Sequence, residues 1–151
     1  MSELGKSEPV LYKERVLPNF GTFVAVSAFL PSAVIVSEPF DINVGLIIGS
    51  LGVSAIWALL ILKAPLILVT ETLLRVGRAS IPKEQIGTPV VVSKDEIFAE
   101  RGPKLNPAAY RSFQGSVKTA IRVPLNDPGD PTPYWLFSTR QPSQLVEALK
   151  K

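Results

Sequence analysis

The sequence predicts an α+β protein in which a transmembrane helical hairpin precedes a small antiparallel β domain with a C-terminal helix. Three observations predict this class. Two uncharged apolar runs, residues 20–37 and 43–62, are separated by a short acidic loop. After residue 63 the apolar runs become short and are bounded by Gly and Pro, which is typical of strands. The last segment begins at Pro142 and places Leu145, Val146 and Leu149 on one helical face.

Each apolar run is long enough to cross a bilayer. A helix rises about 1.5 Å per residue, so a run of about 20 residues covers a hydrocarbon core of about 30 Å. We therefore expect spans at about 17–37 and 43–62. Pro18 suits the first turn of a helix, Pro31 predicts a kink inside the first span, and Asp41 or Asn43 can cap the second. The predicted organisation is an exposed tail (1–16), the hairpin (17–62) and a soluble domain (63–151).

The distribution of charge predicts the topology. The loop carries Glu38 and Asp41 and no base, whereas residues 63–151 carry 13 Lys/Arg against 8 Asp/Glu. Lys and Arg close to a membrane favour its cytoplasmic side. We therefore expect a multi-pass protein of the plasma membrane with both termini in the cytoplasm. A cleaved signal peptide is disfavoured, because the segment before the first run is long and half acidic and a second run follows at once.

Small residues recur at helical spacing in both spans and allow helix backbones to approach closely in lipid. The helix-packing candidates in the first span are Gly21, Ala25, Ala28 and Ser32, and those in the second are Gly45, Gly49 and Gly52. One interpretation is that the two stripes face each other and close the hairpin. The other is that one stripe receives a helix of another subunit.

The segment after residue 63 predicts several short strands. They are expected at residues 65–69, 73–76, 78–81, 89–93, 119–126 and 134–139, with one helical turn at 82–86. Asn106 followed by Pro107 has the pattern of a helix start. Asp127 and Asp130 lie among prolines and a glycine, which predicts a rigid turn. A calcium site is the alternative, but calcium takes six to eight oxygen ligands and no third carboxylate is near.

Two further groups are candidate binding residues. Lys63, Arg75, Arg78 and Lys83 lie close after the second span and are candidates for contact with anionic lipid headgroups, or else are ordinary solvated charges. Tyr134, Trp135 and Phe137 alternate along one strand. They form either the core or, on one face, a partner surface.

The composition disfavours catalysis. The chain has no His and no Cys, which removes the commonest general base, the thiol nucleophile and the commonest ligands of zinc. We expect no enzyme activity, no cofactor and no metal site. No basic–aromatic repeat favours nucleic acid, and no pattern indicates a small-molecule substrate.

Three motifs carry a resemblance to a known family: Tyr12-x-Glu14-Arg15, then Arg75-Val76-Gly77-Arg78-x-x-Ile81-Pro82, then Asp127-Pro128-x-Asp130-Pro131-Thr132-Pro133-Tyr134-Trp135-Leu136-x-Ser138-Thr139-Arg140-x-Pro142. With the two spans, they resemble an uncharacterised family of actinobacterial membrane proteins, domain of unknown function thirty-ninety-three. The resemblance implies an actinobacterial source, two spans and no established activity. The order of strands and terminal helix is also similar to domains of the pleckstrin-homology type, a likeness that carries no function by itself.

These features predict a non-catalytic accessory or assembly subunit of a larger membrane protein complex, with a respiratory assembly as one host considered. Its partners would be membrane lipid and other membrane-protein subunits. The alternative is a membrane-tethered recognition domain that binds anionic lipid or a protein ligand.

Overall fold

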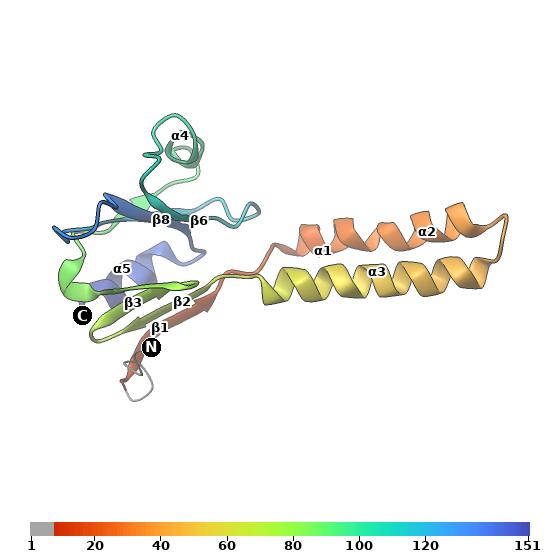
Figure 1. Ribbon diagram of the computed structural model, residues 1–151, viewed down its shortest axis with the longest axis horizontal. Coiled ribbons are helices and arrows are strands. Elements are labelled where there is room, and N and C mark those ends of the chain that lie inside the picture. The colour runs from red at the N-terminus through yellow and green to blue at the C-terminus, as the bar shows by residue number, and fades with distance from the viewer. Residues whose placement is uncertain (1–7) are drawn as a thin grey trace. The chain divides into compact units, whose positions relative to one another are not determined.

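The computed structural model describes residues 8–151 and contains two compact units (Figure 1). One unit is the helical segment Leu17–Ala64. The other combines the chain up to Val16 with Pro65–Lys151. The helical segment is therefore an insertion between two parts of a single β-rich domain, rather than a module that precedes it.

The helical unit is an antiparallel pair. Its elements are α1 (Phe20–Ser27), α2 (Phe29–Ser37) and α3 (Ile42–Leu62). The predicted kink in the first span appears as a break at Ala28, between α1 and α2. Pro31 explains its position, because proline lacks the N–H that would bond the carbonyl four residues earlier. At the start of α3, the Asp41 side chain accepts a hydrogen bond from the Asn43 N–H at 2.8 Å.

Both helical runs meet the length and composition of a membrane span. The runs Phe20–Ser37 and Ile42–Leu62 contain 18 and 21 residues and carry no charged side chain. Large apolar side chains are exposed on them, including Phe20 at 82% and Val36 at 75%. Such a surface is unusual for a helix packed inside a soluble domain.

The first sheet of the domain is a four-stranded antiparallel meander in the order β1-β2-β3-β4. Its strands are β1 (Val10–Arg15), β2 (Leu66–Thr70), β3 (Leu73–Val76) and β4 (Ala79–Pro82). Gly77 opens the two-residue turn between β3 and β4 with φ of 62°, a backbone conformation that favours glycine.

The predicted exposed tail is wrong for the part of it that the structure describes. Residues 10–15 form β1 and pair with β2, and both Tyr12 and Val16 are buried. The physical reason is alternation, since every second side chain of β1 points to the core. Residues 1–7 of the predicted tail lie outside the described residues.

The second sheet has the strand order β5-β7-β8-β6. Its strands are β5 (Val90–Val92), β6 (Tyr110–Ser112), β7 (Ala120–Pro124) and β8 (Tyr134–Ser138). β6 runs parallel to β8, whereas the other pairs are antiparallel. A single 3-10 turn, η1 (Lys83–Gln85), follows β4 as predicted.

One predicted helix is wrong and another was missed. Asn106 starts no helix, because its side chain accepts the N–H of Ala108 in a local turn and β6 follows. The helix lies earlier, as α4 (Ile97–Arg101). Its signal is present in the sequence, because Ser93 and Glu96 have the Ser-x-x-Glu spacing of a capping box and are hydrogen bonded.

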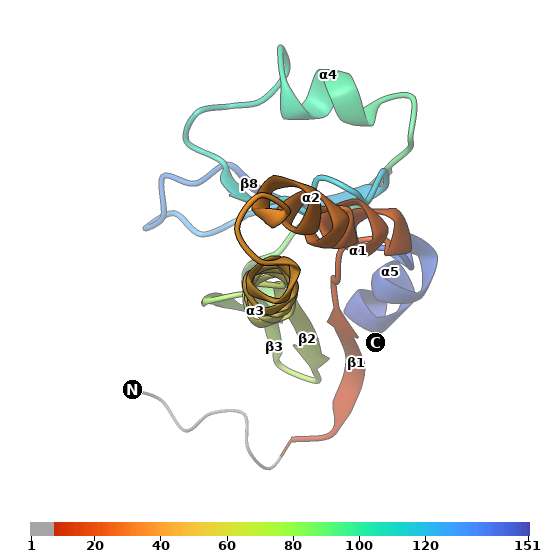
Figure 2. The ribbon, with the colours of Figure 1, turned by 90° about the vertical axis from the view of Figure 1, so that its right-hand side faces the viewer.

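The two sheets share one core. The buried cluster takes side chains from both sheets and from α5 (Pro142–Lys150), which lies between them (Figure 1). Leu145 and Leu149 of α5 are buried in the same cluster as Trp135 and Phe137 of β8. In a second view α5 runs alongside β1 (Figure 2). The terminal helix is thus an integral part of the domain.

Candidate functional site

The outer face of the first sheet carries a group of exposed bases. Lys13 is paired with Leu68, which is paired with Arg75, so these side chains form one row across β1, β2 and β3. Their neighbours in sequence face the core, so this row faces away from it. Arg15, in the next row, is paired with Leu66. Neither Lys13 nor Arg15 is among the candidate binding residues predicted from the sequence, because residues 1–16 are predicted there to form an exposed tail.

These bases lie toward one end of the sheet. The N–H of Val16 donates to the carbonyl of Pro65 at 2.9 Å, and the N–H of Gly77 donates to the carbonyl of Leu66 at 2.8 Å. The turn that contains Arg78 therefore lies at the end of the sheet where the chain passes to and from the segment Leu17–Ala64.

Two acidic side chains lie at the other end of this sheet. Glu8 accepts hydrogen bonds from the Thr72 hydroxyl at 2.8 and 2.9 Å, and Glu71 belongs to the same β2–β3 turn. A hydrogen bond from the Thr70 side chain, and secondarily those from Thr72, lowers the pKa of Glu8. The exposed bases thus lie toward the end joined to the helical segment and these two acids at the far end, whereas Glu14 of β1 alternates with the bases and points to the other face of the sheet.

The four bases proposed from the sequence for lipid contact differ in exposure. Lys63 is exposed and caps the C-terminal end of α3, and Arg75 and Arg78 are exposed on the β3–β4 hairpin. Lys83 is half-buried, and its Nζ donates to the carbonyl of Ala148 at 3.2 Å. Burial lowers the pKa of Lys83. This lysine therefore holds the last turn of α5 to η1 and is withdrawn from the candidate surface.

A half-buried carboxylate joins β1 to the end of β8. Glu14 accepts hydrogen bonds from the hydroxyl of Tyr12 at 2.7 Å, the hydroxyl of Thr139 at 2.6 Å and the N–H of Arg140 at 2.9 Å. Thr139 is fully buried, and its hydroxyl also accepts the N–H of Gln141 at 3.2 Å. We call these residues the Glu14 network. Hydrogen bonds to a charged group are stronger than neutral ones, so this network fixes β1 to the start of α5.

The Glu14 network also shifts a tyrosine. Burial, and secondarily the neighbouring Glu14, raises the pKa of Tyr12 well above its usual range. Both causes disfavour the phenolate, since a negative ring oxygen beside a carboxylate in a poorly solvated site is unfavourable. Tyr12 is therefore a hydrogen-bond donor across the physiological pH range.

The aromatic strand forms core, and the proposed partner surface is wrong. Trp135 is 5% exposed and Phe137 is fully buried in the core between the sheets. Tyr134 points to the other face, where it is half-buried with Leu136 in a smaller cluster. The sequence pattern showed the alternation but not that both faces of β8 are covered, the second by the segment that contains α4.

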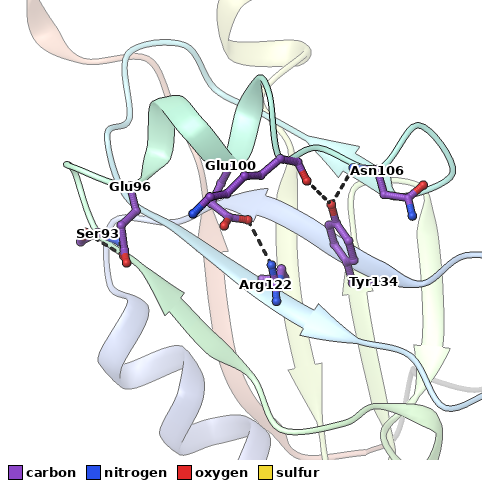
Figure 3. Close-up of polar contacts among 7 residues, drawn as sticks. Ser93, Glu96, Glu100, Asn106, Arg122 and Tyr134 are labelled. Carbon is purple, nitrogen blue, oxygen red and sulfur yellow. Dashed lines mark hydrogen bonds and ion pairs between the residues drawn. The ribbon is translucent and has the colours of Figure 1, made fainter.

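Polar contacts hold that segment on the second sheet (Figure 3). The Tyr134 hydroxyl accepts the N–H of Asn106 at 2.8 Å and donates to the carbonyl of Lys104 at 3.5 Å. Arg122 lies over the Tyr134 ring and forms an ion pair with Glu100 of α4 at 3.2 Å. This arrangement fixes the position of α4 on the second sheet.

Arg101 makes a second link between α4 and the sheets. Its Nη2 donates to the carbonyl of Val117 at 2.9 Å and to the hydroxyl of Ser138 at 2.8 Å, and its guanidinium lies over Phe113. Burial lowers the pKa of Arg101. Its Nε is buried and has no hydrogen-bond partner among the described residues.

In the helical unit, the glycines of α3 face α2. A Cβ on Gly49 would lie 2.8 Å from Leu30 Cδ1, and one on Gly52 would lie 2.8 Å from Phe29 Cε1. A Cβ on Gly45 would overlap the side chain of Ser37. Larger side chains of α2 therefore occupy the groove that these glycines leave.

The stripe of small residues on the first span does not pack along α3, although Ser32 lines an open apolar hollow with Gly45 of α3. The expectation that the two small stripes meet along their length is therefore wrong. The four residues of this stripe are exposed: Gly21, Ala25, Ala28 and Ser32. A Cβ on Gly21 would meet only the Asn19 side chain, at 3.7 Å. The break at Ala28 and the bulk of Phe29 and Leu30 explain the difference, because large side chains fill a glycine groove better than small ones do.

Comparison with known protein families gives a match, and it spans both the helical segment and the β-rich domain. A family model described as Protein of unknown function (DUF3093) matches residues 11–149, which cover the helical segment, the second sheet and all of the first sheet except Val10 of β1. The chain belongs to the DUF3093 family. No curated protein and no solved structure matches it.

The first and the last of the three motifs quoted from the sequence meet in space. Tyr12 and Glu14 of the first motif contact Thr139 and Arg140 of the last, through the Glu14 network. The Asp127–Asp130 segment forms two local turns, in which each aspartate accepts an N–H two residues on, from Gly129 and from Thr132 at 2.8 Å. Within residues 8–151 no group of three or more metal-ligating side chains comes together.

Proposed function

We propose that this DUF3093 protein is a non-catalytic accessory subunit of a larger membrane protein complex, anchored by its helical hairpin. Three features support the proposal. They are the place of the hairpin in the chain, the composition of its surface and a stripe of small residues that faces away from the hairpin's own partner helix.

The connectivity constrains how the hairpin can cross a bilayer. β1 leads into the hairpin and β2 leaves it, and these two strands are hydrogen-bonded neighbours as far as Val16 and Pro65. Both ends of the hairpin must therefore lie on the same side of a membrane. Two spans satisfy that requirement. The bases of the domain and the acidic loop then favour the cytoplasm for both termini.

The surface of the hairpin suits lipid and argues for anchoring rather than transport. Many of its exposed side chains are large and apolar, and helices bond their own backbone groups, as the bilayer requires. No ionisable side chain lies within either run. Charged groups at that depth mark the paths of ions and protons.

One observation carries the proposal of a partner subunit. The stripe of small residues on the first span is exposed on the hairpin itself and does not contribute to its closure. In lipid, small residues are the surface on which a second helix packs closely. We therefore expect a helix of another subunit to pack against this stripe.

Co-purification from the membrane tests the proposal. Ala25→Leu fills the stripe, and Val24→Leu adds bulk at an exposed position of the same helix that lies outside the stripe. We expect a stoichiometric partner with the native chain and with the Val24→Leu control, and its loss with Ala25→Leu. Equal recovery with both variants, or no stoichiometric partner at all, would contradict the subunit proposal.

Topology is tested separately, since the native chain has no Cys. A cysteine at Phe40 in the loop should react with an impermeant thiol reagent on intact cells. A cysteine at Phe98, which is 82% exposed on α4, should react only after permeabilisation. The reverse pattern would reverse the topology and leave the subunit proposal standing.

A second function, recognition of anionic lipid by the domain, is favoured by the bases on the outer face of the first sheet. The order of a four-stranded meander, a second sheet and a C-terminal helix also supports a pleckstrin-homology-like fold. That likeness is one of architecture and adds no ligand.

A further inference from the structure

We propose that the outer face of the first sheet binds the headgroups of anionic phospholipids in the leaflet next to which the domain is anchored. The proposal rests on the membrane anchoring proposed above and names the ligand of the domain. We call the surface the basic face and define it by Lys13, Arg15, Arg75 and Arg78, with Leu66 and Leu68 between them.

Charge is the first argument. The four bases are exposed, and none of them forms an ion pair with another residue of the described range 8–151. Arg75 makes one weak internal bond, from Nε to the carbonyl of Gly77 at 3.4 Å. The cross-strand rows of this face bring together three bases and two leucines and no carboxylate. The face therefore offers free cations in a fixed arrangement.

The position of the bases along the sheet is the second argument. Arg15 is one residue from Val16, and Arg78 lies in the turn whose Gly77 bonds to Leu66, next to Pro65. Val16 and Pro65 are the last and first residues of the domain around the hairpin. Chain continuity for Arg15, and the pairing of β3 with β2 for Arg75 and Arg78, thus keep these bases near the points where the chain enters and leaves the helical segment. The acids Glu8 and Glu71 are placed at the far end.

The chemistry selects the occupant. Arginine forms paired hydrogen bonds with phosphate oxygens and stays charged, and three of the four bases are arginines. Leu66 and Leu68 are half-buried and add apolar surface of the kind that meets the interfacial region. Each base near an anionic surface contributes about fivefold to binding, so three arginines together have an effect that is easily measured and is sensitive to salt.

The experiment uses the full chain in lipid nanodiscs, which keeps the hairpin in place. A fluorophore is attached to a single cysteine at Ser80, which is exposed and lies in the row of Arg75 on the same face. A second protein carries it at Phe98, on the opposite side of the sandwich. The discs contain phosphatidylcholine alone or with phosphatidylglycerol, and a quencher is attached to the lipid headgroup.

We expect quenching at residue 80 to rise severalfold with phosphatidylglycerol and to fall again in high salt, while quenching at residue 98 stays low. The variant Arg15→Gln/Arg75→Gln/Arg78→Gln should lose this rise. The matched control Lys94→Gln/Lys104→Gln/Lys118→Gln removes the same charge from exposed positions off the basic face and should keep it.

Two results would overturn the proposal: quenching at residue 80 that does not depend on phosphatidylglycerol, or equal losses in the two triple variants. Failure of the anchoring itself looks different. In that case the protein would separate from the discs during flotation in every lipid composition, and the basic-face proposal would fall with it.

Discussion

Removing β1 should unfold the domain, although β1 precedes the hairpin in the sequence and every other strand follows it. The perturbation is a comparison of two proteins without the hairpin. One is the fragment 65–151. The other keeps residues 8–16 and joins Val16 to Pro65 through a four-residue Gly/Ser/Asn linker, which is feasible because Val16 and Pro65 are hydrogen bonded at 2.9 Å.

The size of the effect follows from what β1 buries. Tyr12 is 9% exposed and Val16 is fully buried, and burial of such side chains stabilises a fold by about 1.5–3 kcal/mol each. Loss of both therefore removes about 3–6 kcal/mol. The fragment also loses the whole β1–β2 ladder and the carboxylate that accepts three hydrogen bonds from Tyr12, Thr139 and Arg140. Because a domain of about a hundred residues has a free energy of unfolding of only about 5–15 kcal/mol, the fragment should be largely unfolded.

The assay is urea denaturation followed by tryptophan fluorescence. The chain has two tryptophans, and Trp57 leaves with the hairpin, so Trp135, which is 5% exposed, is the only reporter. The linked protein should show blue-shifted emission and one cooperative transition. The fragment 65–151 should show red-shifted emission and no transition. A fragment that unfolds cooperatively at the same urea midpoint as the linked protein would refute the inclusion of β1 in the domain.

Three more predictions use the same proteins or the reconstituted chain. Glu14→Gln should lower the free energy of unfolding of the linked protein by about 1–3 kcal/mol, since an amide N–H₂ would face the N–H of Arg140; an unchanged urea midpoint would contradict this. Because the pKa of Tyr12 is raised in the folded protein, its contribution to the free energy of unfolding is fully present below the unfolded tyrosine pKa of about 10 and is lost as pH rises above it. Tyr12→Phe should therefore reduce the fall in urea midpoint between pH 8 and pH 11. An equal fall in both proteins would count against the raised pKa. Gly49→Leu should speed hydrogen exchange in α2 of the reconstituted chain, because its Cβ would lie 2.8 Å from Leu30 Cδ1, while the control Gly21→Leu should not; equal effects would show that the α3 groove is not what closes the hairpin.

Local patterns predicted most of the elements. The two apolar runs, the cap at Asp41 and the Val-rich strands are marked by local hydrophobic patterns and by the residues that bound them. The helices α1 to α3 and most strands could therefore be placed from the sequence. The terminal helix was equally clear, because Leu145 and Leu149 form one apolar face with Pro142 at its start.

Non-local pairing was the part that local patterns could not supply. Six residues of β1 contain three charges and look like a solvated tail, and only pairing with β2 across the hairpin makes Tyr12 and Val16 interior. The same limit explains why Lys83 was predicted to contact lipid and why the aromatic strand was considered as a partner surface. A lysine that bonds the carbonyl of Ala148 looks identical in sequence to one that faces a membrane.

If the hairpin spans a membrane as proposed, its insertion between two paired strands couples membrane topology to folding of the domain. Arg15 pairs with Leu66, so the β1–β2 ladder closes only after the whole hairpin has been made. In a bilayer, a hairpin with only one span inserted would leave β1 and β2 on opposite sides, and β1 alone cannot build a sheet. The Glu14 network would then be absent too, since Glu14 lies on β1 and Thr139 lies at the far end of the chain. Under the proposed anchoring, insertion of both spans would be a precondition of a stable domain, and a protein with one span misplaced would present an exposed core. On this argument, the basic face and any partner contact of the domain exist only in molecules whose anchor is complete.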